Sequence, residues 1–164
     1  MNISIKHLMD IISTRTVDFF NEEMGIAVNE QDIRLVENNR LELNYLTSVV
    51  TVGSTPHIFV IFSYTKNIID KIFDIYTEEL EILDEERLEY VEETAGDIVN
   101  IIVGNSIADF ENNGIAISLS PPIVISNAQS IAKSRSVKFF VNNLKTSNGD
   151  MSIFCVCPNE LFEV

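Results

Sequence analysis

The chain has 164 residues, of which 46% are hydrophobic and 22% are charged, a composition typical of one globular domain with its own core. We therefore expect a single domain over residues 1–164. The formal net charge of −14 argues against nucleic acids and anionic membranes as partners, because both are polyanions. The longest apolar run, Ile58–Phe62, is too short to cross a bilayer, and the N-terminus lacks a signal-peptide pattern, so we expect a cytoplasmic protein.

The N-terminal half predicts a helix, a strand pair and a second helix. Apolar residues recur at helical spacing over residues 3–24, and Gly25 is suited to ending that helix. The segments Leu41–Val52 and Ile58–Phe62 are rich in β-branched and aliphatic residues, which predicts two antiparallel strands. Thr65 is a candidate cap for a short helix whose apolar face comprises Ile68, Ile69, Ile72, Phe73 and Tyr76.

The C-terminal half predicts a long helix followed by strands. The helix runs from about Asp84 to Asn113 and is ended by Gly114. The Pro121-Pro122 pair interrupts a strand-forming stretch, as expected of an edge strand or a break between strands. A hairpin is expected from two further segments and the turn residues between them: Val137–Val141, Met151–Val156 and Asn148-Gly149. The expected fold class is therefore α+β, an α/β sandwich with a mostly antiparallel sheet packed against helices.

The two cysteines, Cys155 and Cys157, lie two residues apart on the last predicted strand. Residues at that spacing point to the same face of a strand, about 7 Å apart, which is too far for an unstrained disulfide. The sequence supplies neither metal partners nor a local base for them. We therefore expect two buried structural thiols.

The long helix divides into an apolar side and a polar stripe when it is set turning about 100° per residue. The apolar side, which we expect to face the sheet, comprises Leu88, Val91, Ala95, Ile98, Val99, Ile102 and Ser106. Nearly opposite lie Glu93, Asp97, Asn100 and Gly104, and Asp97 and Asn100 are surface neighbours because they are three residues apart. Gly96 and Gly104 flank this pair. Their missing side chains would either leave an approachable surface around the pair or allow a close contact inside the protein. The residues alone favour the close internal contact.

The segment Ala95–Asn105, with the sequence AGDIVNIIVGN, resembles the active helix of the CheC/CheX/FliY family of chemotaxis phosphatases. The family pattern is a Glu, two spacers, an Asn and a later Gly-Asn pair on a long surface helix, and the order of elements is similar to CheX. The resemblance implies a phosphatase that hydrolyses the aspartyl phosphate of a CheY-like receiver domain in bacterial chemotaxis. It also implies a homodimer.

The resemblance further implies roles for individual residues. Asn100 would orient the attacking water, and Asp97 would take the place of the family's Glu and pair with a receiver lysine. The partner-binding residues implied by position are Glu93, Gly96, Gly104 and Asn105. No metal or cofactor is expected in this chain, because the receiver would supply its own Mg²⁺.

Two features leave alternatives open. Asp97 is one methylene shorter than the family's Glu, which favours a module that binds a receiver without hydrolysis, and an acidic dimeric scaffold is a third possibility. In the scaffold, Ile58–Phe62 and the final hairpin would support dimerisation through sheet edges. A second Asp-x-x-Asn occurs at Asp18–Asn21, and we interpret it as chance because Phe19 and Phe20 between its ends are expected in the core.

Overall fold

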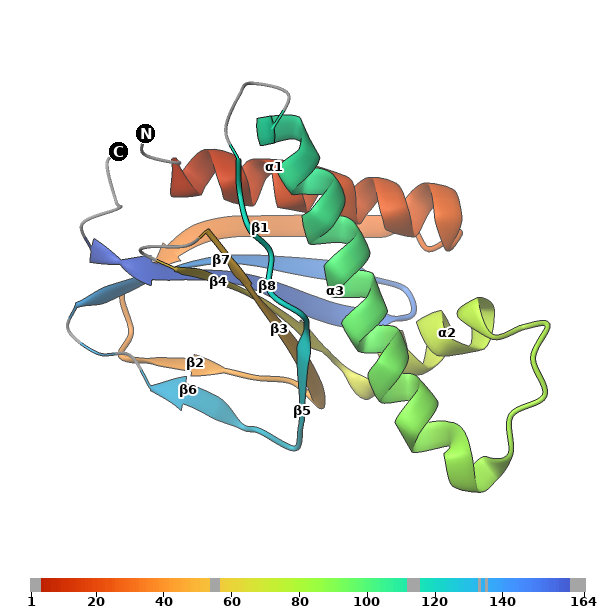
Figure 1. Cartoon of the computed structure of the whole chain (residues 1–164). Coiled ribbons are helices and arrows are strands. Elements are labelled where there is room, and N and C mark those ends of the chain that lie inside the picture. Colours follow the sequence, from red (N-terminus) through yellow and green to blue (C-terminus); the bar gives the residue numbers. More distant parts are fainter. Residues whose placement is uncertain (1–3, 54–56, 112–115, 133, 135, 160–164) are drawn as a thin grey trace.

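The structure is a computed structural model that describes residues 4–53, 57–111, 116–132, 134 and 136–159. A fully antiparallel six-stranded sheet, in the order β1-β7-β8-β4-β3-β5, carries all three α-helices on one face (Figure 1). A two-stranded ribbon, β2-β6, lies against the other face. The elements are α1 (Ile5–Asp18) with a π-helical turn (Phe19–Glu23), β1 (Val28–Val36), β2 (Arg40–Glu42), β3 (Leu46–Val52), β4 (Ile58–Tyr64), α2 (Lys66–Tyr76), a 3₁₀ turn (Asp84–Glu86), α3 (Arg87–Glu111), β5 (Ile123–Ser126), β6 (Ser130–Ala132), β7 (Val137–Thr146) and β8 (Gly149–Pro158). The predicted α+β fold class is confirmed.

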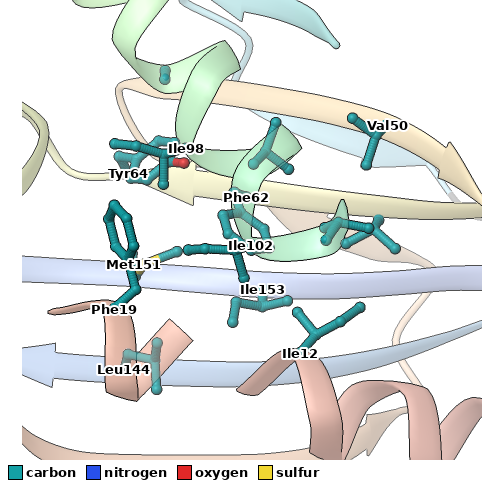
Figure 2. Close-up of a cluster of buried hydrophobic side chains, with 14 of the residues drawn as sticks. Ile12, Phe19, Val50, Phe62, Tyr64, Ile98, Ile102, Leu144, Met151 and Ile153 are labelled. Carbon is teal, nitrogen blue, oxygen red and sulfur yellow. The ribbon is translucent and has the colours of Figure 1, made fainter. Parts of the chain in front are cut away.

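The main core lies between the helices and the sheet. Figure 2 shows Ile12 of α1 and Ile98 and Ile102 of α3 meeting Phe62 of β4 and Ile153 of β8. All five are at most 2% exposed, and each contributes about 1.5–3 kcal/mol by leaving water. Alternate strand residues point toward the helices, so the sheet fixes the face of α3 that is buried.

A smaller core fills the other face of the sheet. The ribbon brings Leu41 of β2 over Ile61, Val141 and Phe154 of the sheet, and all four side chains are buried. This ribbon was not predicted, because the segment Leu41–Val52 was expected to form one strand. The structure divides it into β2 and β3, with residues 43–45 between them.

Three sequence-based predictions are wrong. The sequence pattern assigns Tyr76 to the apolar face of the second helix, but Tyr76 is 42% exposed at the end of α2. Leu88 was placed on the sheet-facing side of the long helix, but it is 56% exposed, because the first turn of α3 projects past the strands (Figure 1). The sheet-edge route to a dimer through Ile58–Phe62 and the final hairpin is also excluded. Strand β4 and both hairpin strands, β7 and β8, lie inside the sheet, whose edges are β1 and β5.

Most other predicted elements are confirmed. Thr65 is the N-cap residue of α2, but its hydroxyl makes no capping hydrogen bond and donates to the carbonyl of Asp150 instead. The hairpin β7–β8 closes at Thr146 and Gly149, and Gly25 adopts the left-handed conformation expected at a helix end, with φ +62°. The predicted helix end at Asn113–Gly114 lies outside the described residues. Within the described part of the chain, no helix combines the length and apolar character needed to span a membrane.

The cysteines behave as predicted. Cys155 and Cys157 are both free and buried, 0% and 1% exposed, on the helix-facing side of β8. Burial raises the pKa of Cys155 strongly, and it raises the pKa of Cys157 to about 11. Both thiols are therefore protonated at neutral pH and serve packing.

Candidate functional site

Helix α3 is held at both ends. At its N-terminus the guanidinium of Arg87 stacks on the ring of Phe73, 4.6 Å from its centroid, and donates to Asp74 at 3.1 Å. Near its C-terminus Asp109 accepts two hydrogen bonds from Nη2 of Arg15, at 2.9 and 3.0 Å. Between these contacts Ala95, Ile98, Val99 and Ile102 are buried against the sheet. The helix therefore has one fixed rotation, which determines which side chains face water.

Asp97 and Asn100 lie together on the exposed side of this helix. Both side chains are exposed, as is Glu93 one turn earlier. Residues three apart on a helix have Cβ atoms about 5–6 Å from each other. The described residues offer neither side chain a hydrogen bond or an ion pair. A carboxylate and a carboxamide therefore stand side by side, with their hydrogen-bonding groups available to a partner or to water.

A shallow groove runs beside Asp97. It has a volume of about 460 Å³ and is lined by Glu89, Glu92, Glu93, Gly96, Asp97, Pro122 and Val124. One wall comes from α3 and the other from β5 and the proline before it. The hydroxyl of Ser126 in β5 donates to Glu92 at 2.6 Å, which joins the two walls.

Gly96 packs against β5 and also lines the groove. It is buried, and a Cβ placed on it would lie 3.5 Å from both Pro122 and Val124, in ordinary van der Waals contact. A Cβ would therefore fit between α3 and β5, so their packing does not require a glycine at this position. At the same time Gly96 lines the groove beside Asp97.

The other two partner-binding candidates lie further along α3. Gly104 is half-buried, and a Cβ there would be 3.8 Å from Leu119. Asn105 is exposed but faces α1, where it lines a separate cavity of about 110 Å³ with Asp18 and Glu22. The structure thus brings Glu93, Gly96 and Asp97 into one groove, and it places Asn105 outside that groove.

The second Asp-x-x-Asn does not form a comparable site. It lies across the end of α1 and the π-helical turn, and its intervening Phe19 and Phe20 are 5% and 0% exposed. Asn21 accepts a hydrogen bond from the backbone of Val28 at 3.4 Å. The expectation that both phenylalanines belong to the core is confirmed.

The groove is acidic and carries no metal cluster in the described part of the chain. Four of its seven lining residues are carboxylates, but nowhere among the described residues do three or more His, Cys, Asp or Glu side chains converge as metal ligands would. Sequence reasoning missed Glu89, Glu92, Pro122 and Val124 as groove residues. Pairing of Glu92 with Ser126 spans 34 positions, so no local spacing could have indicated it.

Comparisons with known proteins agree on one family. The family model described as "Chemotaxis phosphatase CheX" matches residues 46–144, which include β3, α3 and most of β7. The comparison with curated proteins found no match.

Solved structures share the fold. A CheX from Desulfovibrio desulfuricans is 17% identical, with a TM-score of 0.77 over 93% of this chain and 99% of that chain. A CheC-like superfamily protein from Shewanella is 14% identical, with a TM-score of 0.74 over 95% of this chain and 98% of that chain. CheX from Borrelia burgdorferi, in a complex with CheY, BeF3 and Mg²⁺, is 16% identical, with a TM-score of 0.70 over 96% of this chain and 98% of that chain. Because the family model covers more than half of the sequence, this chain belongs to the CheX family of chemotaxis phosphatases.

Proposed function

We propose that this protein accelerates hydrolysis of the aspartyl phosphate on a CheY-like receiver domain, with Asp97 and Asn100 as the working pair. The observation that carries the proposal is the exposed placement of both side chains on one face of a helix that is anchored at both ends. Family membership supports the reaction class. The Borrelia CheX–CheY complex supports a receiver domain as the partner.

Asn100 has the chemistry required to position water. Its carboxamide carries both N–H donors and a carbonyl acceptor, so it can hold a water molecule in a defined orientation without ionising. Phosphoryl transfer needs the attacking oxygen roughly in line with the leaving oxygen, and positioning is the main contribution that a protein makes to it. Asn100 would hold the water on the far side of the phosphorus from the receiver's aspartate. The receiver brings its own Mg²⁺.

Asp97 would bind the receiver rather than the water. Its carboxylate can accept hydrogen bonds from an ammonium group of the partner, and charge assistance makes such bonds stronger than neutral ones. Glu93 and the groove beside it extend this anionic surface by one turn. Gly96 and Gly104 add no side chain to the surface of α3 on either side of the pair, which would let the partner's backbone come near, and Asn105 would contact it at the side of α3 that faces α1.

The alternative function is receiver binding without hydrolysis. The short side chain of Asp97 is the observation that favours it, because a carboxylate with about 1.5 Å less reach than glutamate would contact the receiver only if the receiver shifts from its position over Asn100. A protein of this kind would bind a phosphorylated receiver without shortening the lifetime of its phosphate.

Replacements of Asp97 test both functions. The wild-type protein should accelerate loss of phosphate from a purified receiver, followed by radiolabel or fluorescence. Asp97→Ala should weaken receiver binding about tenfold, since it removes one charge-assisted contact. Asp97→Glu should match or exceed the wild-type rate because it restores the reach. If neither wild type nor Asp97→Glu shortens the phosphate lifetime of any receiver that binds, the phosphatase function is contradicted. Receiver binding without hydrolysis would then be the remaining function.

A further inference from the structure

A second surface feature lies next to the candidate site. Five large apolar side chains are exposed within residues 76–90: Tyr76 (42%), Leu80 (61%), Leu83 (60%), Leu88 (56%) and Tyr90 (37%). Leu88 lies two residues before Tyr90 on α3, so the two point to different sides of the helix. We call the other four side chains the apolar corner; it joins the end of α2 to the start of α3. We propose that the apolar corner is a docking surface for the same receiver domain whose phosphate reaches Asn100, an inference that rests on the proposed function.

The apolar corner has an ordered backbone. Arg87 ties α3 to α2 through the Phe73 ring and Asp74. Backbone hydrogen bonds from Leu80 to Thr77 and from Glu86 to Leu83, both 2.9 Å, close the turns between them. Clusters of exposed apolar side chains are uncommon on monomeric proteins and mark interaction surfaces.

Tyr90 links the apolar corner to the Asp97–Asn100 pair. Tyr90 precedes Asp97 by seven residues, or two helical turns, so the two share one side of α3 about 10 Å apart along its axis. Glu93 lies between them on the same stripe. A stable interface covers about 800 Å² on each partner, which two polar side chains cannot provide. The apolar corner supplies adjoining contact area on the helix that carries the site.

Charge identifies the kind of partner. From Glu78 to Asp97 the sequence has ten carboxylates and one cation, Arg87, which is engaged by α2. A second copy of this chain would bring the same negative charge to the corner, and nucleic acid or an anionic bilayer would do likewise. The surface instead fits a protein that presents apolar side chains edged by lysine or arginine. A receiver seated over Asn100 is the protein that must lie beside this corner.

The test compares binding with turnover. The double variant Leu83→Ser/Tyr90→Ser should raise both the Kd for beryllofluoride-loaded receiver and the KM for phosphorylated receiver about tenfold or more, because central apolar contacts carry most binding energy. Its kcat at saturating receiver should equal that of wild type. The control is Leu35→Ser, which removes another exposed leucine (41%) from the edge strand β1. That control should leave Kd and KM unchanged.

The outcomes separate this inference from the proposed function. If the double variant binds the receiver more weakly than wild type, the docking surface is supported. If wild type itself leaves the phosphate lifetime unchanged in the same system, the phosphatase function is contradicted while the docking surface stands. Wild-type Kd and KM in the double variant, with normal hydrolysis, overturn the docking surface and leave the phosphatase standing. A corner-dependent dimer seen by sedimentation, with receiver binding unaffected, also overturns it.

Discussion

Asn100→Ala is expected to lower kcat for phosphoreceiver hydrolysis by about 100-fold or more, while the Kd for the receiver stays close to that of wild type. The loss follows from positioning, since a misplaced attacking water costs about two orders of magnitude. Asn100 is exposed, so its truncation should change the free energy of unfolding by less than about 0.5 kcal/mol. Single-turnover decay of phosphorylated receiver measures kcat, and titration with beryllofluoride-loaded receiver measures Kd.

The matched control for this variant is Asn29→Ala. Asn29 is an exposed asparagine on β1, at the edge of the sheet opposite β5. Its removal should leave both constants unchanged. A wild-type kcat in Asn100→Ala would show that the water is held by another group, and equal losses in kcat and binding would make Asn100 a docking residue.

Gly149→Ala should lower the free energy of unfolding by about 3 kcal/mol, combining a conformational and a steric cost. Gly149 has φ +126°, which L side chains rarely adopt, and it lies where the β7–β8 hairpin meets the first turn of α2. An added Cβ would lie 2.8 Å from the backbone nitrogen of Ile68 and 2.9 Å from Oγ1 of Thr65. That hydroxyl also donates to the carbonyl of Asp150 at 2.9 Å, so the helix cannot move away without losing a hydrogen bond.

Gly25→Ala separates the two costs. Gly25 also has a positive φ, +62°, but a Cβ there would have no neighbour within 4 Å. Its loss of stability should be about 1 kcal/mol, the conformational part alone. Urea unfolding of both variants gives the comparison, and equal destabilisation would show that the contact with α2 carries no cost.

The parts of the fold that follow from the sequence are those with a clear period and a buried face. Helix α3 is predictable because Ala95, Ile98 and Ile102 repeat at helical spacing and are all buried against the sheet. The same period places Asp97 and Asn100 on the outer side, so their exposure follows from the sequence pattern alone. Strand β4 is predictable from its nearly continuous apolar run, since it is buried in the middle of the sheet.

The parts that do not follow depend on contacts between distant segments. Strand β1 has no alternation, and its residues 29–35 are exposed, so it is held by pairing with β7 rather than by a buried face. Whether Leu88 is buried depends on where the strands end beneath α3, which periodicity does not reveal. The groove beside Asp97 requires Pro122 and Val124 to lie against Gly96, a contact that only the folded chain creates.

The most direct measurement is the structure of the wild-type protein bound to a beryllofluoride-loaded receiver. We expect the Asn100 carboxamide to lie next to the beryllium fluoride, on the side opposite the receiver's aspartate. We also expect Asp97 to contact a cationic side chain of the receiver and Tyr90 to be covered by the partner. A receiver seated elsewhere on the molecule, with the Asp97–Asn100 side of α3 still open to solvent, would contradict it.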